Sequence, residues 1–464
     1  MKSETIAAIA TPKGTGGVGI VRISGENSLK VLSQFFIPYK AGEGISAVSR
    51  DTSAKEILKM VPRYMYLGEI NNKELKEQCL AVFFKDPNSY TGEDVVEIHC
   101  HGGVYICNKI LELCLRNGAR LADPGEFSKR AFVNGKLSLD SAEGVIDLIN
   151  AASNAEARAA FNLFDGKLFK IVKAMQNALT DILAEIEVNL DYPEHDIEYE
   201  TSENIKKRLT VIENTLNQLL DGAKTGMLLK HGVSVLILGK PNVGKSSLLN
   251  TMLNFEKAIV TDIAGTTRDV VEGTYIYKDI KFNLSDTAGI RDTQNKIERI
   301  GIDKAKAMTE AADIILLLLD SSTGITKEDK QSMSLLGGKE CFVVVNKIDS
   351  GDKIDYGLIK DKFDIIKISA KNNIGITELK EAIFKKTVGG VVANETILLN
   401  LRHTEALNEA LYIIGKTLPQ LLQNSLDCVA VDIKQVWEVL GKITGEGADE
   451  VVIDAIFSKF CLGK

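Results

Sequence analysis

The stretch GKPNVGKSS at residues 239–247 decides the fold of the central part of this chain. A short apolar run, VSVLILG (233–239), precedes it and suits a buried parallel strand, whereas KSSLLNTML after it has helical spacing. A glycine-rich turn between a strand and a helix can point backbone N–H groups at phosphate oxygens, and the helix dipole adds to the attraction. The stretch therefore predicts a phosphate-binding loop in which Lys245 reaches the β- and γ-phosphates and Ser246 ligates Mg²⁺.

Three further segments follow at the distances that a GTP-binding domain requires: DTAG at 286–289, NKID at 346–349 and SAK at 369–371. Asp286 occupies the position from which a carboxylate holds Mg²⁺ through water. Asp349 can accept hydrogen bonds from N1–H and the 2-amino group of guanine, and adenine offers neither donor. Together the four segments predict an enzyme that hydrolyses GTP to GDP and phosphate.

The residues expected to contact GTP come from these motifs and from the segment TDIAGTTRD (261–269). They are Asn242, Val243, Gly244, Lys245, Ser246, Ser247, Thr261, Asp262, Ile263, Ala264, Gly265, Thr266, Thr267, Asp286, Thr287, Ala288, Gly289, Asn346, Lys347, Asp349, Ser369, Ala370 and Lys371.

One part of the usual hydrolysis machinery is missing. The residue directly after DTAG is Ile290, which cannot orient the attacking water as the glutamine of Ras-like GTPases does. The nearest glutamates downstream are Glu298 and Glu310, either of which could polarise a water molecule. The alternative interpretation of Glu298, which is followed by an arginine, is a solvated helix carboxylate.

The phosphate-binding loop also carries Asn242, and the segment that follows it carries the adjacent threonines Thr266 and Thr267. One threonine hydroxyl can meet Mg²⁺, which leaves the other free. An asparagine oxygen with nearby backbone carbonyls makes a hard-oxygen pocket beside the phosphates. A monovalent cation there would place positive charge where an arginine finger otherwise acts.

Several long strings, inside and outside these motifs, point to one family. They are TPKGTGGVGIVRISG near the start, SYTGEDVVEIHCHGG (89–103), DPGEFSKRAFVNGKLSL (123–139), GKPNVGKSSLLN, TDIAGTTRD, DTAGIRDT…IERIG and the C-terminal CLGK. On these strings the chain resembles the MnmE (TrmE) family of tRNA uridine-modification GTPases over its whole length. The resemblance implies a potassium-activated GTPase that works as a homodimer with the flavoprotein MnmG (GidA), in a heterotetramer or larger complex.

The resemblance also implies a substrate and a set of metal ligands. The substrate is the wobble uridine (position 34) of certain tRNAs, modified at C5 with an aminomethyl or carboxymethylaminomethyl group. Asn242 and Thr266, with the backbone of Thr261 and Ile263, correspond to the K⁺ ligands. Ser246 and Thr267 correspond to the Mg²⁺ ligands, and the catalytic Glu298 corresponds to the carboxylate that positions the water.

By the same resemblance, the N-terminal region binds a one-carbon donor, 5-formyl- or 5,10-methylene-tetrahydrofolate. Its charged contacts correspond to Arg22, Glu97 and Lys136, with the C-terminal Lys464. Cations suit the glutamate tail of folate and a carboxylate suits the pterin. Cys461 is the other residue of interest in the tail: it is either a small buried hydrophobe after an apolar helix or a catalytic thiol carried by a mobile tail.

Composition agrees with these expectations. The chain has 464 residues, enough for two or three cores, and a net charge of −7, which argues against broad charge-driven binding of nucleic acid but leaves room for a local basic face that meets tRNA. The seven scattered cysteines fit a reducing cytoplasm. The longest apolar run, IILLLL (314–319), is far too short to span a membrane and predicts a buried strand.

The expected architecture is an α+β multidomain protein. A mixed α/β, folate-binding-like dimerisation domain covers 1–120, and residues 121–222 form the first part of a helical domain. A Ras-like P-loop α/β GTPase domain at 223–388 is inserted between helices, and 389–464 completes the helical bundle and ends in the CLGK tail.

Two N-terminal patterns, and the function of the chain, each have more than one interpretation. GTGGVG (14–19) favours a tight turn over a phosphate cradle, and His99 and His101, two apart on a strand, share a face on which they could ligate a metal. The alternative function is a regulatory or ribosome-assembly GTPase of the Era and EngA type. The regions outside the GTP-binding motifs discriminate between the two functions.

Overall fold

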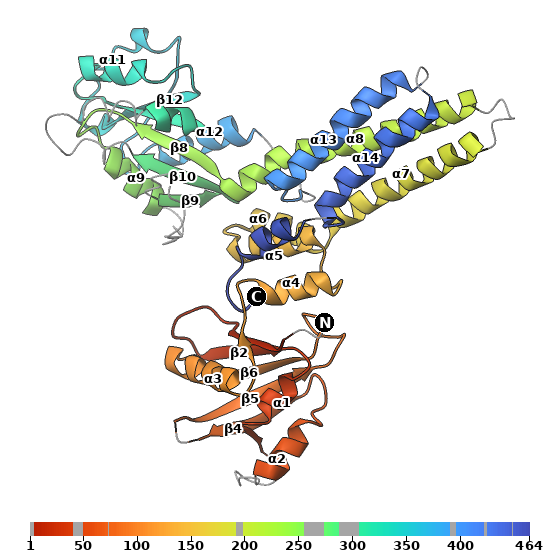
Figure 1. Ribbon diagram of the computed structural model, residues 1–464. Coiled ribbons are helices and arrows are strands. Elements are labelled where there is room, and N and C mark those ends of the chain that lie inside the picture. Colours follow the sequence, from red (N-terminus) through yellow and green to blue (C-terminus); the bar gives the residue numbers. More distant parts are fainter. Residues whose placement is uncertain are drawn as a thin grey trace, which may run out of the picture. The chain divides into compact units, whose positions relative to one another are not determined.

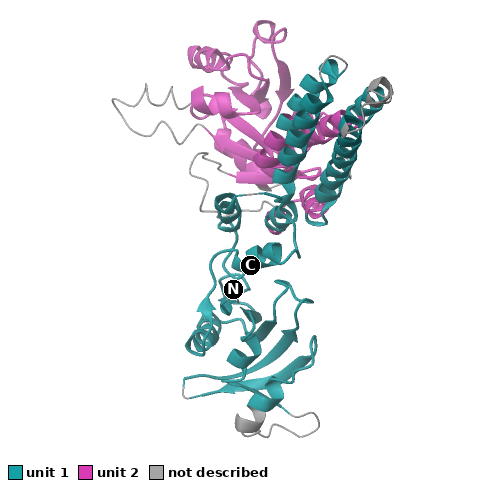
Figure 2. Ribbon diagram, turned by 45° about the vertical axis from the view of Figure 1, so that its right-hand side comes forward, with its two compact units in different colours: residues 1–146, 164–210, 409–464 teal, residues 147–163, 211–408 magenta. Residues whose placement is uncertain are grey.

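The computed structural model describes residues 4–39, 50–72, 74–191, 198–254, 273–286, 306–389, 396–421, 425–447 and 449–464. The chain divides into two compact units, coloured separately in Figure 2. Unit 1 consists of residues 1–146, 164–210 and 409–464, and unit 2 consists of residues 147–163 and 211–408. Unit 1 is therefore built from segments on both sides of unit 2 in the sequence.

A seven-stranded sheet forms the N-terminal part of unit 1 (Figure 1). Its strands are β1 (Ile6–Ile9), β2 (Val18–Ser24), β3 (Phe36–Pro38), β4 (Met65–Asn71), β5 (Lys76–Phe84), β6 (Val95–His101) and β7 (Arg120–Leu121). Their order is β3-β4-β5-β6-β2-β1-β7, with all neighbours antiparallel except β1 and β7. The helices of this part are α1 (Ser28–Leu32), α2 (Arg50–Ile57) and α3 (Val104–Arg116).

The two faces of this sheet differ because side chains alternate along each strand. One face is apolar and packs against the three helices, with Val21, Ile98 and Ile110 fully buried in this core. Among the described residues, Phe127 packs on the other face at its β1 end, against Ile6 and Ala8. The rest of this second face carries Arg22 and Glu97 and is the face on which charged residues meet.

The helical part of unit 1 joins segments that lie far apart in the sequence. The helices from 126 onward that lie wholly in unit 1 are α4 (Glu126–Val133), α7 (Lys167–Asp191), α14 (Leu426–Thr444) and α15 (Glu450–Phe457). The residues of α5 (Leu139–Asn150), α6 (Asn154–Phe164), α8 (Glu198–His231) and α13 (Leu401–Gln420) are divided between the two units. α7 packs along α14, and Gln176 Nε2 donates to the carbonyl oxygen of Trp437 at 3.2 Å. The expectation that the GTPase domain is inserted between helices of one bundle is confirmed.

Unit 2 contains a six-stranded sheet of order β13-β12-β11-β8-β10-β9. The strands are β8 (Val233–Leu238), β9 (Gly273–Tyr277), β10 (Ile280–Asp286), β11 (Ile314–Asp320), β12 (Cys341–Asn346) and β13 (Asp364–Lys367). All neighbours are parallel except β9 and β10. The strands expected at 233–239 and 314–319 are confirmed.

Both faces of the unit 2 sheet are buried, which is why its strands are continuous apolar runs. One face packs against α9 (Lys245–Asn254) and α12 (Ile376–Val388), and the other packs against residues around α11 (Lys327–Ser334). Short 3₁₀ turns lie at Ile348–Ser350 and Tyr356–Leu358. In the described part of the chain, no helix combines the length and the apolarity that crossing a membrane requires.

Candidate functional site

The phosphate-binding loop connects β8 to α9, as its sequence predicts. Its backbone is curled by two residues with positive φ, Asn242 at 61° and Gly244 at 103°. A Cβ atom added to Gly244 would collide with Nδ2 of Asn346, so glycine is required for this close approach. Val243 is buried, whereas Ser246 and Ser247 are exposed at the first turn of α9, where a Mg²⁺ ligand has to be.

The lysine of the loop is turned onto the loop itself in this structure. Lys245 is buried, and its Nζ donates to the carbonyl oxygens of Gly239 at 3.1 Å and Lys240 at 3.2 Å. These carbonyls satisfy an ammonium group that would otherwise be buried without hydrogen bonds. The two phosphates of the expected role would compete for the same ammonium group.

The guanine-binding motif NKID (346–349) begins at the carboxyl end of β12 and is hydrogen-bonded to the phosphate-binding loop. Asn346 Nδ2 donates to the carbonyl oxygen of Val243 at 3.0 Å, and its Oδ1 accepts from the backbone N–H of Ala370 at 3.0 Å. Lys347 Nζ donates to the carbonyl oxygen of Asn242 at 2.8 Å. The structure thus brings three of the predicted motifs together, although the phosphate-binding loop lies more than 100 residues before NKID and SAK follows NKID by about 20 residues.

Asp349, the residue expected to read guanine, is held in its ionised form. Ser369 Oγ donates to Asp349 Oδ1 at 2.5 Å, and this hydrogen bond lowers the pKa of the carboxyl group below its ordinary value. The charge of Lys371 acts in the same direction. A carboxylate that stays ionised can accept both N–H groups of guanine, so these neighbours suit the role predicted for Asp349.

Asp286, the expected Mg²⁺ carboxylate, is the last residue of β10 and is buried. It pairs in register with Ile237 of β8, which places it beside the start of the phosphate-binding loop. The remaining expected contacts lie outside the described residues. They are Thr261, Asp262, Ile263, Ala264, Gly265, Thr266, Thr267, Thr287, Ala288, Gly289 and Glu298.

The candidacy of Glu310 for positioning the water is wrong. Its carbonyl oxygen accepts from Nζ of Lys339 at 2.6 Å, and Lys339 lies just before β12 begins at Cys341. The phosphate-binding loop follows the opposite, carboxyl end of β8, a strand parallel to β11 and β12. Glu310 therefore lies at the wrong edge of the sheet.

The second candidate site lies on the partly uncovered face of the unit 1 sheet. Arg22 of β2 and Glu97 of β6 are register partners, and Arg22 Nη2 lies 2.8 Å from Glu97 Oε1. Arg22 Nη1 also donates to the carbonyl oxygen of Gly463 at 3.4 Å. Gly463 approaches the carbonyl of Ile9 so closely that no Cβ atom would fit. The CLGK tail is therefore seated on β1 and β2.

The neighbours in this cluster shift the pKa values of Glu97 and Lys464. Burial acts to raise the pKa of Glu97, but a hydrogen bond with His99 and the charge of Arg22 outweigh burial and lower it. Burial lowers the pKa of Lys464, the Cys461 thiol opposes that shift, and Arg22 adds to it. Cys461 itself is exposed, so its interpretation as a small buried hydrophobe is wrong.

Lys136, the fourth residue expected around the folate, lies beside the loop that joins β5 to β6. A Cβ atom on Gly92 would contact Lys136 Cγ at 3.2 Å. The ring of Tyr90, from the same loop, lies 5.3 Å from Arg22 Cζ, and the ring of Phe127 lies 5.6 Å from it. The loop thus lies next to Arg22 on one side and next to Lys136 on the other.

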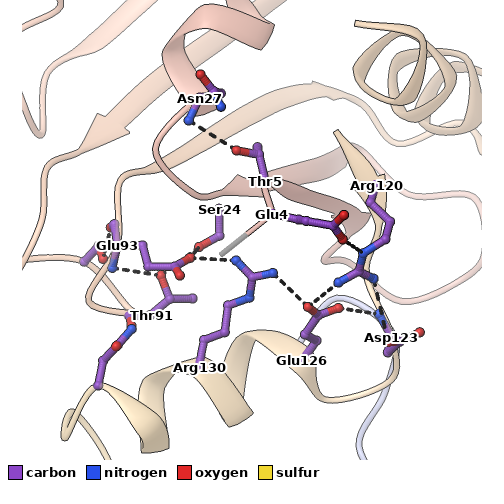
Figure 3. A network of polar contacts seen from close by, with 12 residues as sticks. Glu4, Thr5, Ser24, Asn27, Thr91, Glu93, Arg120, Asp123, Glu126 and Arg130 are labelled. Carbon is purple, nitrogen blue, oxygen red and sulfur yellow. Dashed lines mark hydrogen bonds and ion pairs between the residues drawn. The ribbon is translucent and has the colours of Figure 1, made fainter. Parts of the chain in front are cut away.

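A network of charged and hydroxyl groups holds this loop in place (Figure 3). Arg130 of α4 donates to Glu93 Oε2 at 2.9 Å and to Glu126 Oε1 at 2.8 Å. Glu93 also accepts from Ser24 Oγ at 2.8 Å, and Arg120 bridges Glu126 to Glu4. Glu93 and Arg130 could not be predicted from the sequence, since no local pattern marks two side chains that meet from different elements.

The two histidines of β6 have different partners. His99 Nε2 lies 3.3 Å from Glu97, and His101 Nδ1 lies 2.7 Å from Glu77. The described residues hold no group of three or more potential metal ligands, so neither histidine supports a metal site among them. The segment GTGGVG leads from the loop after β1 into β2, as a turn between antiparallel strands does.

Comparisons with known proteins extend over the regions outside the GTP-binding motifs. The family model described as the N-terminus of the GTP-binding protein TrmE matches residues 5–136, and the MnmE helical domain matches residues 139–461. The chain is similar to the tRNA modification GTPase MnmE of Lactiplantibacillus plantarum, with 40% identity over 99% of this chain and 98% of that protein.

Two further relatives carry the same description. MnmE of Alkaliphilus metalliredigens is 42% identical over 99% of both chains, and MnmE of Clostridioides difficile is 42% identical over 99% of both. The N-terminal and helical regions were the features that separate a tRNA-modifying enzyme from a ribosome-assembly switch, and these are the regions that the family models match. The chain therefore belongs to the MnmE family of tRNA modification GTPases, enzymes that hydrolyse GTP in the course of modifying tRNA.

Proposed function

We propose that this GTPase is activated by K⁺ and acts with the flavoprotein MnmG to modify C5 of the wobble uridine of certain tRNAs. The one-carbon unit comes from 5-formyl- or 5,10-methylene-tetrahydrofolate. The observation that carries this proposal is the cluster of Arg22, Glu97 and the CLGK tail on one sheet face of unit 1. A GTPase switch alone needs no such cluster.

The cluster has the chemistry that a folate requires. The glutamate tail of folate is anionic and suits a guanidinium or ammonium group, which Arg22, Lys136 and Lys464 supply. The pterin ring presents N–H donors that an ionised carboxylate can accept, and the neighbours of Glu97 keep its pKa low. The ring of Tyr90 adds an apolar surface beside Arg22.

Calorimetry with 5-formyl-tetrahydrofolate tests this site. We expect Arg22→Met to weaken binding by at least tenfold, since a charge-assisted hydrogen bond contributes roughly 1.5–3 kcal/mol. Arg116→Met is the matched control. Arg116 lies on α3, on the covered side of the sheet, and forms exposed ion pairs with Glu112 of the same helix and with Glu74, which lies between β4 and β5. Wild-type protein that binds no folate, or equal loss in both variants, would argue against the site.

Potassium activation rests on Asn242. Its left-handed backbone and its carbonyl, held by Lys347, fix the residue at the exposed edge of the phosphate-binding loop. Asn242→Gly removes the side-chain oxygen and keeps the left-handed backbone free of strain, so it is a better test than alanine. Hydrolysis should be faster in K⁺ than in Na⁺ at equal ionic strength, and Asn242→Gly should lose most of that difference. Equal wild-type rates in the two salts would contradict potassium activation.

The water-positioning role proposed for Glu298 predicts a loss of turnover without a loss of affinity. General-base or positioning groups typically contribute 10²–10⁴-fold. Glu298→Ala should lower kcat within that range, while the dissociation constant for GTP changes little. Normal turnover of the variant would favour the alternative interpretation, a solvated carboxylate.

Dimerisation through unit 1 is supported by the second face of its sheet. Met65, Val82, Glu97 and Arg22 form one row across β4, β5, β6 and β2. At the β4 end of this face Met65 and Leu67 are 45% and 46% exposed. An apolar surface continuous with a charged ligand cluster suits a second copy of the chain that covers both.

Light scattering after size exclusion tests this interface. We expect a dimer for the wild type at micromolar concentration and a monomer for Leu67→Asp, because the new carboxylate would be buried without a partner. Leu58→Asp is the control: Leu58 is 55% exposed but follows α2, which covers the opposite face. A dimer that survives Leu67→Asp would place the interface elsewhere.

The tRNA reaction is tested in cells. Mass spectrometry of tRNA nucleosides from a deletion strain should show loss of the C5 group on the wobble uridine, and the wild-type gene should restore it. We expect the Arg22→Met gene to fail even though its product hydrolyses GTP. We further propose that the protein works in the cytoplasm, which its seven free cysteines support.

A further inference from the structure

One lysine of the phosphate-binding loop takes no part in the roles described above. Lys240 is only 9% exposed, and its side chain points away from the loop into the protein. Its Nζ lies 2.9 Å from Asp329 Oδ2, 3.0 Å from Thr323 Oγ1 and 3.4 Å from Thr326 Oγ1. Thr323 and Thr326 lie between β11 and α11, and Asp329 lies in the first turn of α11; this part of the chain contains none of the GTP-binding motifs.

The segment that receives Lys240 is itself held by hydrogen bonds. Thr326 caps α11 in a capping box with Asp329, whose Oδ2 accepts from the backbone N–H of Thr326 at 2.8 Å. Asp329 is fully buried, and Lys240 and these donors are the hydrogen-bond partners of its Oδ2. The side chain of Lys240 is therefore fixed to the first turn of a helix rather than to a flexible loop.

The same segment is also joined to the guanine motif. Asp320, the last residue of β11, lies 2.7 Å from Lys347 Nζ. Burial acts to raise the pKa of Asp320, but the hydrogen bonds from Lys347 and Ser322 outweigh burial and lower it. One segment, 320–329, thus contacts both the phosphate-binding loop and the residue that holds Asn242.

The contact between Lys240 and Asp329 affects the phosphate-binding loop because the backbone of Lys240 is part of that loop. Its carbonyl oxygen is one of the two that hold Lys245, the lysine expected at the phosphates. The rest of the loop is held by Asn346 at Val243 and by Lys347 at Asn242. Lys240 anchors the first half of the loop, which those two contacts do not reach.

We propose that Lys240 and Asp329 are positioning residues for GTP binding: their buried ion pair holds the phosphate-binding loop in the curled form that nucleotide requires. A loop that is already curled does not lose further conformational freedom when phosphate binds. The pair touches no reacting atom. It acts through the backbone of residues 239–244, and it deepens the established GTPase activity without depending on folate or potassium.

The test compares two buried ion pairs in unit 2. Lys240→Met breaks the proposed pair. Lys281→Met is the matched control, because Lys281 Nζ lies 2.8 Å from the buried Glu156, and Lys281 is near the start of β10, whereas Asp286 is at its end. Both variants should lose thermal stability. Only Lys240→Met should also weaken GDP and GTP binding, by about tenfold or more, the change that 1.4 kcal/mol represents.

Kinetics and rescue separate positioning from a purely structural role. For Lys240→Met, KM for GTP should rise with the dissociation constant while kcat at saturation keeps most of its value. Lys240→Arg should recover much of the affinity, because a guanidinium can donate to the same carboxylate. Nucleotide binding in Lys240→Met that matches Lys281→Met would overturn the proposal.

A second variant covers the case in which Lys240→Met does not fold. Asp329→Asn keeps the shape of the capping box and removes the charge that faces Lys240. We expect it to weaken GDP binding in the full chain by a comparable factor. Adding Asp329→Asn to Lys240→Met should raise KM for GTP little beyond the value of Lys240→Met alone. Unchanged affinity in Asp329→Asn, or fully additive losses in the double variant, would show that the pair does not hold the loop.

Discussion

Gly244→Ala is the substitution whose effect the structure predicts in most detail. The residue has a φ of 103°, a backbone conformation that costs an L-residue roughly 1–2 kcal/mol. The new Cβ atom would also displace the Asn346 side chain, which has hydrogen bonds to Val243 and Ala370. Each of these contributes about 1 kcal/mol.

Together the strain and the two lost hydrogen bonds amount to about 3–4 kcal/mol, if all of it opposes the nucleotide-binding form of the loop. Since every 1.4 kcal/mol is a factor of ten, the dissociation constant for GDP should rise roughly 100- to 1,000-fold. Titration with a fluorescent guanine nucleotide measures this directly. Circular dichroism establishes that the variant is folded at the temperature of the titration.

Gly118→Ala is the control for backbone strain. Gly118 has the same φ of 103°, but a Cβ atom added there would meet nothing within 4 Å, and the residue belongs to unit 1. It should lower stability modestly and leave GDP affinity unchanged. A Gly244→Ala protein that binds GDP within threefold of the wild type would refute the argument, because Asn346 could then move without consequence.

Three further predictions concern other parts of the molecule. Burial acts to raise the pKa of Glu126, but two arginines and a backbone N–H lower it below 4.5, so its contribution to stability is present above that pH and is lost as the pH falls through the lowered pKa. Glu126→Gln should therefore flatten the acid side of a melting-temperature profile, and an unchanged profile would contradict this. Alkylation followed by mass spectrometry should modify the exposed Cys461 and Cys428 long before Cys79, whose pKa burial raises to about 12. Asp349→Asn should shift nucleotide preference from GTP toward xanthosine triphosphate in competition binding, since an amide donates where the carboxylate accepted; retained preference for GTP would show that another group reads the base.

The GTP-binding motifs could be predicted from the sequence because each is local. A strand, a glycine-rich turn and a helix N-terminus are consecutive in residues 233–254, and their geometry follows from short-range sterics and hydrogen bonding. The position of Asp320 could also have been inferred, because a carboxylate ends the apolar run that predicts β11. These motifs were enough to predict a buried parallel strand before the phosphate-binding loop and a Ras-like P-loop α/β domain around it.

The choice between Glu298 and Glu310 shows where that reasoning stops. Both follow DTAG in the sequence, and only strand direction shows that Glu310 lies at the opposite edge of the sheet. Likewise, the exposure of Cys461 depends on how the tail is seated and not on the apolar helix before it. Distance along the sequence therefore does not predict which edge of the sheet a side chain lies at or whether it is exposed.

The sequence by itself determined the reaction class, the nucleotide and the family, because these depend on strings of neighbouring residues. Only the tertiary structure decided which distant groups meet: Arg22 and Gly463 are 441 residues apart, and Lys240 and Asp329 are 89 apart. Such pairs produce no periodic pattern in the sequence, because each depends on the packing of whole sheets and helices. A buried charge is stable only where that packing supplies its partner, so these pairs can be identified only from the tertiary structure.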